Sequence, residues 1–494
     1  MNSLGRNTLV ACAVATALGT SAAHALAPSS TIDFTFYAAG GSAQANAFYV
    51  AFGDNTTNVD SYTNTTNGTD SGNYRVLFGT TTAAITFNGF TIPAGKNVLY
   101  MYKFNGGSFT NGIAPQVGGG SALAYPTVAS IQAATAIGGA VAGTGVPTYA
   151  YAANTGNSQT PDWGVADLEV SMFKGFNNPT GNAGGTVKNT DGGPAPTVGA
   201  TTGLYDNLFG IAVTHNVFTG THPKTSFSRA EMEGIIEGTV SDWSQLFADD
   251  GTQLAAGGII FLDRGEGSGS KASGNQYFLG YPGVGSAARF PFSSANAYTS
   301  AALAATGTET PQDIAEASSS TLVADLKLAQ STSRRAIAVL GLEFPPALNQ
   351  LVAGTNSYDI AKIGGVAVDT GGASDNINGS VGTSYINVVK GNYDYYYQNS
   401  FNTRAGFLAG ANANAAFANQ ILKTMTSAGF VGADTGGAFP GGVPGTLLDA
   451  DLFSTLTSTS KGTTLMTRNK LSTAPLQPKL NAIATGIPVS NDPL

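Results

Sequence analysis

Short apolar runs recur along the chain and predict the strands of a buried sheet. Runs of this length, bounded by polar or glycine-rich turns, are typical of strands that are covered on both faces. The clearest are Tyr74–Phe78, Asn97–Tyr102, Gly210–Val213, Gly258–Leu262 and Ala336–Leu340.

Segments of helical character alternate with these apolar runs. They are Ala45–Val50, Ser228–Glu237, Ser273–Leu279, Ser320–Ala329 and Asn412–Ser427. Alternating strands and helices are typical of proteins in which helices cover a sheet of mostly parallel strands. The pattern therefore predicts an α/β fold with a parallel-rich sheet.

Two stretches interrupt this alternation. Asp54–Asn73 is rich in Asn and Thr, and Gly112–Asn157 contains many Gly and Ala residues. Such runs bury little apolar surface and favour turns. We expect both to be loop-rich insertions on the surface of the protein.

The composition is that of a folded protein with room for two lobes. The chain has 494 residues, of which 42% are hydrophobic, and a single hydrophobic core stops growing near about 250–300 residues. Its formal net charge is -8 at pH 7. An acidic chain is a poor match for nucleic acid or anionic lipid, so the sequence predicts neither partner.

The first residues have the pattern of an export signal. Arg6 precedes an apolar run that continues through Leu18, and Ala23-His24-Ala25 fits a small-residue cleavage site. We expect residues 1–25 to be a signal peptide that is cleaved after Ala25. The mature protein is then expected in the periplasm or outside the cell.

Cys12, the only cysteine, lies inside this signal. It ends a Leu-Val-Ala-Cys sequence that resembles a lipoprotein motif, but the apolar run continues past it, which favours an ordinary signal peptide. A mature chain without cysteine has neither disulfides nor thiolate metal ligands. No later segment offers about 20 consecutive apolar residues, so we expect no membrane span.

The stretch "DRGEGSGSKASG", which begins at Asp263, predicts an anion site. It joins an apolar run to a helix that we expect from Ala272 onward. At such a junction, backbone N–H groups lie at a helix N-terminus and point toward an anion. The groups expected there belong to Ser268, Gly269 and Ser270, whereas Lys271 is expected to point along the exterior of the helix.

Arg264 adds a planar fork of donors that suits a tetrahedral oxyanion, and Glu266 could orient that fork. The alternative interpretation is an ordinary helix start that is capped by a serine. The sequence alone leaves both interpretations open.

The sequence contains no recognisable catalytic motif in this region. A Walker A loop needs Gly before its Lys-Ser/Thr pair, where this chain has Ser270-Lys271-Ala272, and the hydrolase pattern G-x-S-x-G fails around Ser268. His215 and His222 have no metal or triad spacing, and we expect them to be loop or packing residues. We therefore expect neither an enzyme nor a cofactor.

The segment "RGEGSGS" resembles the Arg-x-Asp-Gly-Ser-Gly-Thr loop of a known family. That family is the phosphate-binding component of bacterial ABC phosphate importers, a type 2 periplasmic binding protein. The resemblance implies that phosphate is held by Arg264, Ser268, Gly269 and Ser270. Glu266 stands in place of the family's Asp.

Three upstream blocks support the same resemblance. "DWGVAD" resembles Asp-Phe-Gly-Ala-Ser-Asp, which implies that Asp167 accepts a hydrogen bond from the protonated phosphate. "YAAGGSAQANAFY" resembles the Gly-Ala-Gly-Ala-Thr-Phe entry and aligns Ser42 with its Thr, although Ala43 replaces the family's aromatic residue. "NGGSFTNG" aligns Ser108 with a Gly-Ser-Gly-Gly loop. The later segments Phe227–Leu246, Lys362–Val368 and Tyr385–Tyr397 follow the family's order.

The resemblance implies two lobes that close on the ligand. Residues 26–212 and 385–494 would form one lobe and residues 213–384 the other. The implied function is capture of inorganic phosphate without catalysis, by a monomer that delivers it to an ABC importer in the membrane. Sulfate would be excluded because it carries no proton for the carboxylate to accept.

Two other classes of protein stay open at this point. A secreted surface or matrix protein could use the same fold for adhesion, and the low charged fraction of 11% fits an extracellular location. A phosphate-ester hydrolase could use the anion loop, but the sequence lacks a His or metal cluster to support one.

Overall fold

A computed structural model of the chain describes the residues from which the sheet and its helices are built. They are residues 30–64, 74–104, 106–140, 147–152, 156–179, 193–282, 311–316, 318–344, 346, 350–352, 355–368, 386–389, 392–426 and 446–447. The predicted signal peptide lies outside the described residues.

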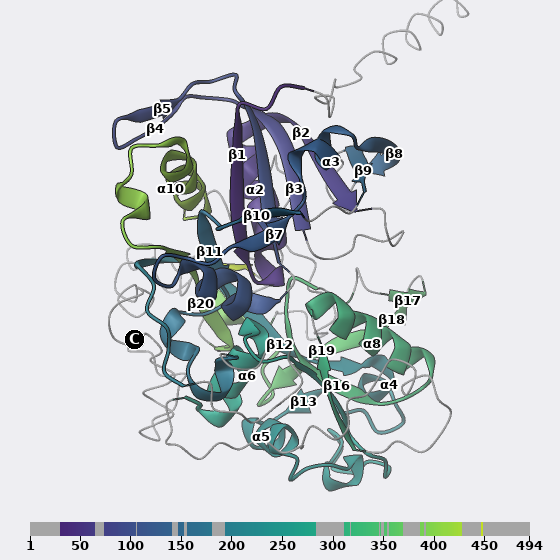
Figure 1. Cartoon of the computed structure of the whole chain (residues 1–494). Helices are drawn as coiled ribbons and strands as arrows, with labels where there is room; N and C mark the ends of the chain where they lie inside the picture. Colours follow the sequence, from purple (N-terminus) through teal and green to yellow (C-terminus); the bar gives the residue numbers. More distant parts are fainter. Residues whose placement is uncertain are drawn as a thin grey trace, which may run out of the picture.

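A mixed sheet of 15 strands forms the framework of the protein (Figure 1). Its order is β15-β14-β16-β12-β20-β11-β1-β6-β3-β2-β9-β8, with β13, β19 and β21 paired off this path. The strands are β1 (Phe34–Gly40), β2 (Thr56–Asn64), β3 (Tyr74–Thr81), β6 (Asn97–Lys103), β8 (Thr135–Ala140), β9 (Pro147–Tyr151), β11 (Trp163–Ala166), β12 (Ala200–Thr214), β13 (Ser226–Phe227), β14 (Ile260–Arg264), β15 (Gln312–Glu316), β16 (Ala336–Gly341), β19 (Tyr358–Ile363), β20 (Tyr396–Thr403) and β21 (Thr446–Leu447).

Three two-stranded sheets and a set of helices complete the described structure. The paired strands are β4 (Ile85–Phe87) with β5 (Phe90–Ile92), β7 (Leu123–Tyr125) with β10 (Asn157–Gln159), and β17 (Gln350–Val352) with β18 (Thr355–Asn356). The helices are α2 (Ala45–Asn55), α3 (Val128–Gln132), α4 (His215–Phe218), α5 (Arg229–Glu237), α6 (Gly269–Leu279), α8 (Ser319–Ser331), α9 (Ile386–Val389) and α10 (Ala413–Met425). No helix among the described residues has the length and apolar character that crossing a membrane requires.

The long strand β12 joins two parts of the sheet. Its first half pairs with β20, and its second half pairs with β16 and β19, antiparallel in each case. Figure 1 shows α2 and β1 to β3 on one side of β12, and α5, α8 and β16 on the other. The division into the two predicted lobes stays a prediction.

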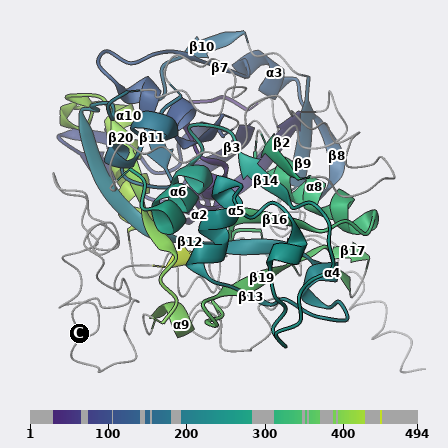
Figure 2. The same ribbon diagram turned by 90° about the horizontal axis from the view of Figure 1, so that it is seen from below.

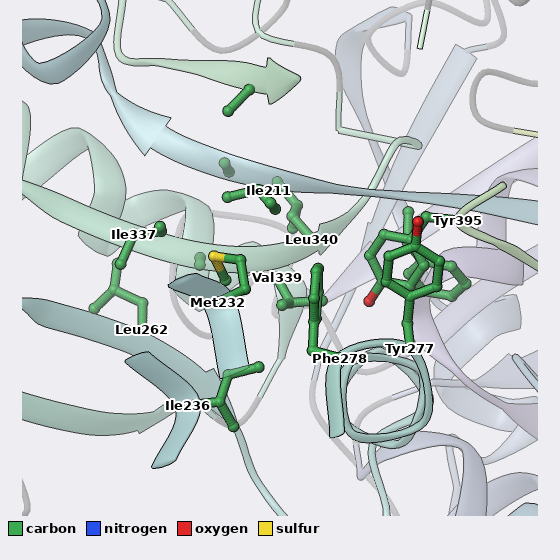
Figure 3. Close-up of a cluster of buried hydrophobic side chains, with 14 of the residues drawn as sticks. Ile211, Met232, Ile236, Leu262, Tyr277, Phe278, Ile337, Val339, Leu340 and Tyr395 are labelled. Atoms are coloured by element: carbon green, nitrogen blue, oxygen red, sulfur yellow. The ribbon is translucent and has the colours of Figure 1, made fainter. Parts of the chain in front are cut away.

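Packing on β16 fixes the orientation of α6. Tyr277 of α6 stacks on Tyr395, with ring centroids 4.2 Å apart, and Phe278 meets the same ring edge-on. Figure 3 shows these side chains beside Val339 of β16, in a cluster that continues to Ile211 of β12. Figure 2 shows α5 and α6 together near β12 and β16. These contacts hold the last turn of α6, and the helix is buried from Gly269 to Phe278. The first turn of α6 therefore has a defined position as well.

Local sequence signals set the ends of the helices. Ser228 and Glu231 form a reciprocal capping box at the start of α5, and Gly238 ends the helix with a left-handed φ of 70°. Ser268 caps α6, which ends at Gly280 in the same conformation. These residues explain why each helix begins and ends where it does.

The predicted α/β class is confirmed, since helices alternate with the strands of one large mixed sheet. The five predicted strands and five predicted helices are all present. Most ends shift by a few residues, but the strand predicted at Gly210–Val213 is the last part of the longer β12, which begins at Ala200. The sheet is less parallel than predicted, because β12 runs antiparallel to β16, β19 and β20.

The prediction that both polar stretches lie outside the core is wrong in part. Within Asp54–Asn73, strand β2 pairs with β3 and β9, and Asp60 and Tyr62 are buried. Within Gly112–Asn157, β8 and β9 extend the edge of the sheet. Thr and Tyr favour strands, so these polar segments can pair with neighbouring strands and become part of the sheet, which their overall composition did not indicate.

Candidate functional site

The candidate site lies where several strands end at one edge of the sheet. Strands β1, β6 and β11 are mutually parallel, so their carboxyl ends meet at this edge. Ser42 follows β1, Ser108 follows β6 and Asp167 follows β11 directly. The topology therefore brings together three residues that are far apart in the sequence.

Asp167 is the buried carboxylate at the centre of this group, with a relative exposure of 4%. Its Oδ2 accepts a hydrogen bond from Ser108 Oγ at 2.9 Å, and its own N–H donates to that oxygen at 3.2 Å. Gln44 Nε2 donates to Oδ1 of Asp167 and, at 2.9 Å, to Asn399 Oδ1. The carboxylate is thus held by two side chains that follow different strands.

Burial raises the pKa of Asp167, and the hydrogen bonds from Gln44 and Ser108 together with the charge of Arg264 offset part of that rise. A carboxylate with a raised pKa is a stronger base, so it is a better acceptor for a hydrogen bond from a protonated ligand.

The predicted anion loop lies between β14 and α6. Arg264 is the last residue of β14, and α6 begins at Gly269, three residues earlier than the sequence predicted. Ser268 caps the helix, because its side chain accepts from the N–H of Lys271. Its own N–H donates to Gly265 O at 3.2 Å, so Ser268 offers a hydroxyl rather than a backbone donor. The N–H groups of Gly269 and Ser270 lie in the first turn, which has no intrahelical acceptors.

Arg264 is buried and lies between the loop and α8. Its Nη1 donates to Ser319 Oγ at 2.5 Å, and its Nε donates to Glu316 O at 3.3 Å. Ser319 also accepts from Ser42 Oγ at 3.4 Å. One hydroxyl at the start of α8 therefore connects Arg264 with the residue that follows β1.

Asp167 lies against the first turn of α6. A Cβ built on Gly269 would be 2.0 Å from Oδ2 of Asp167, so only glycine leaves room for the carboxylate there. Nearby, Phe109 N–H donates to Gly267 O at 2.9 Å. A helix N-terminus stabilises negative charge, and in this structure the protein's own carboxylate is placed beside it.

The structure thus brings Ser42, Ser108, Asp167, Arg264 and the 268–270 turn into one region. Glu266 lies in the turn after Arg264, and its charge is among those that raise the pKa of Lys271. Its role as the residue that orients Arg264 stays a prediction.

Sequence reasoning misses two residues that touch this group and misplaces a third. Gln44 lies in the block that aligns Ser42, two residues after that serine, and Ser319 lies in a Ser-Ser-Ser-Thr run that signals the start of a helix. The expectation that Lys271 points along the exterior of the helix is wrong. Lys271 is buried and pairs with Asp263 at the end of β14.

His215 on α4 and His222 on a surface loop each contact an aspartate. His215 Nδ1 is 2.7 Å from Asp359 Oδ2, and His222 Nδ1 is 3.0 Å from Asp250 Oδ2. Within the part of the chain that the structure covers, no cluster of three or more His, Cys, Asp or Glu side chains could hold a metal ion.

Comparisons with known proteins give partial likenesses in structure. No family model and no curated protein matches the chain in sequence. A phosphate-binding protein from Stenotrophomonas maltophilia is 14% identical over 75% of this chain and 78% of that chain, with a TM-score of 0.32.

Two further structures are similar over shorter parts. An ABC-type phosphate transport receptor from Vibrio cholerae is 14% identical over 45% of this chain and 70% of its own, with a TM-score of 0.25. A phosphate ABC transporter substrate-binding protein from Clostridium perfringens, solved with bound phosphate, is 13% identical with a TM-score of 0.26. The match covers 45% of this chain and 65% of that protein, less than two thirds of its length.

Proposed function

We propose that the chain captures inorganic phosphate, or another tetrahedral oxyanion that carries a proton, and performs no catalysis. One observation carries the proposal. The buried guanidinium of Arg264 and the buried carboxylate of Asp167 converge with the first turn of α6. A protonated oxyanion needs both donors and one acceptor, and this set supplies them.

Each group has a distinct task in the proposed complex. Arg264 and the N–H groups of Gly269 and Ser270 donate to the unprotonated oxygens, and the hydroxyls of Ser268 and Ser270 add further donors. The hydroxyls of Ser42 and Ser108, which donate to Ser319 and Asp167 in this structure, would turn toward the ligand to donate to it. Asp167 accepts a hydrogen bond from the proton that phosphate keeps near neutral pH. Sulfate would present only lone pairs to this carboxylate, so we expect phosphate to be preferred.

The proposal extends to the predicted lobes and location. Residues 26–212 with 385–494, and residues 213–384, would close around the anion as a monomer. Export and delivery to an ABC importer are part of the same proposal, supported by the pattern of the first 25 residues. Fractionation of cells that express the full chain tests export, because a protein retained in the cytoplasm would contradict it.

Calorimetric titration with inorganic phosphate at neutral pH tests the binding itself. We expect one phosphate per chain, and we expect Arg264→Ala to weaken binding by about 2–3 kcal/mol because it removes charge-assisted hydrogen bonds. Millimolar phosphate that gives neither heat nor a thermal shift would reject the proposal.

Lys96→Ala is the matched control for charge. Lys96 pairs with Asp33 at 3.0 Å on the surface, at the opposite end of β1 and β6 from the site. Surface pairs of this kind contribute little to stability, so the variant removes one positive charge without touching the site. Equal losses of affinity in the two variants would mean that overall charge, not Arg264, governs binding.

A further inference from the structure

Glu343 lies at the same edge of the sheet as the candidate site. It follows β16 by two residues, and β16 runs parallel to β14, whose last residue is Arg264. The register pairs Leu262 with Ala338, so the two strands end at nearly the same level. The topology therefore places Glu343 beside the anion loop, although 79 residues of sequence separate it from Arg264.

The carboxyl group of Glu343 is buried, with a relative exposure of 7% for the residue. It folds back over the end of β16, where a Cβ built on Gly341 would be 2.0 Å from Oε2 of Glu343. Among the described residues, neither carboxyl oxygen makes a hydrogen bond to another side chain or to a neighbouring residue. A buried polar group without such a partner needs an explanation.

The charged and titratable groups around Glu343 are those of the site. Asp167 faces it from the end of β11, Arg264 from the end of β14 and Tyr205 from β12. Burial, followed by the charge of Asp167, raises the pKa of Glu343 to about 8, while its own backbone N–H and Arg264 act in the opposite direction. At neutral pH the side chain is therefore mainly a carboxylic acid.

A buried carboxylic acid has one O–H donor, and leaving a buried donor unsatisfied is destabilising. An ionised carboxylate at the same place would lie close to Asp167 and would repel an anion. Only the protonated form is compatible with an oxyanion between Arg264 and Asp167.

We propose that Glu343 is a further ligand-contacting residue of this site, which donates a hydrogen bond from its carboxylic acid to the bound oxyanion. The inference rests on the proposed function and deepens it. The site would then hold the ligand between one carboxyl group that accepts a hydrogen bond, Asp167, and one that donates a hydrogen bond, Glu343. Loss of the Glu343 proton removes a donor and adds a negative charge beside the ligand, so phosphate affinity falls as the pH rises past 8.

The test is calorimetric titration with inorganic phosphate at pH 7 and pH 9, on the full mature protein and on two variants. Glu343→Gln keeps a donor of similar shape and cannot ionise, whereas Glu343→Ala removes the group. Asp60→Asn is the control, because Asp60 is another buried carboxyl whose pKa burial raises, to about 7, and it lies within β2 away from the site. Circular dichroism verifies that each variant is folded at both pH values.

We expect Glu343→Gln to bind like the wild type at pH 7 and about tenfold more tightly than the wild type at pH 9, since one pH unit beyond the pKa leaves about a tenth of the acid form. Both proteins meet the same mixture of phosphate species, so this ratio isolates Glu343. Glu343→Ala should bind about tenfold more weakly than the wild type at pH 7, and Asp60→Asn should follow the wild type at both pH values.

Parallel loss of affinity in the wild type and Glu343→Gln between pH 7 and pH 9 would overturn the inference, whatever Glu343→Ala does. Phosphate binding by the wild type in that case would leave the proposed function standing. A wild-type protein that binds no phosphate at either pH would overturn both the proposed function and the inference about Glu343.

Discussion

Gly269→Ala tests the contact on which the candidate site depends, the one between Asp167 and the start of α6. A Cβ at this position would lie 2.0 Å from Oδ2 and 2.3 Å from Cβ of Asp167, well inside the roughly 3.5 Å at which carbon atoms begin to attract. The added methyl group therefore has to displace the Asp167 side chain. Displacement also weakens the hydrogen bonds that Asp167 accepts from Gln44 and Ser108.

The expected loss of stability follows from these two effects. Forcing a methyl group into a packed site costs about 1–3 kcal/mol, and a hydrogen bond to a charged group contributes about 1.5–3 kcal/mol. The better helix propensity of alanine offsets at most about 1 kcal/mol of this loss in stability. We expect a net loss of roughly 2–4 kcal/mol in the free energy of unfolding, together with weaker phosphate binding.

Gly274→Ala is the matched control in the same helix. A Cβ there would lie 3.4 Å from Cγ2 of Val339, which is an ordinary contact. Replacing a helical glycine in this setting should stabilise the protein by about 0.5–1 kcal/mol. Guanidinium unfolding followed by circular dichroism compares the two midpoints. If Gly269→Ala unfolds at the same denaturant concentration as Gly274→Ala or at a higher one, Asp167 does not lie against α6.

Two further substitutions separate binding from folding. Asp167→Asn replaces an acceptor by an amide that can also donate, so discrimination against sulfate should fall while phosphate binding survives in weaker form. Competition binding with phosphate, sulfate and arsenate measures this discrimination. An unchanged ratio of sulfate to phosphate affinity would mean that Asp167 is not the selective residue. Lys271→Ala breaks a buried ion pair with Asp263 and should lower the free energy of unfolding by about 3 kcal/mol. A melting temperature equal to that of the wild type would show that this ion pair contributes nothing to stability.

The residues that can be predicted from the sequence are those whose neighbours along the chain are also their neighbours in space. Arg264 and the serines of the turn lie between an apolar run and a helix, a local pattern that fits an anion site or an ordinary helix start. Asp167 directly follows a short apolar strand, and the resemblance of its block to a known family motif makes it a candidate. In each case a few consecutive residues carry the information.

Gln44, Ser319 and Glu343 cannot be found in this way. No local pattern marks any of the three as a site residue, and their positions beside the site arise from the order of strands in the sheet. The error at Lys271 has a different cause. Because α6 begins at Gly269, Lys271 lies in its first turn, where its side chain reaches Asp263 on the preceding strand.

The position of Asp167 beside the start of α6 also bears on the stability of the fold. A buried guanidinium with no opposite charge nearby would be destabilising. In this structure burial lowers the pKa of Arg264, and the charge of Asp167 acts in the opposite direction. The carboxylate therefore helps the fold to tolerate a buried cation at the end of β14.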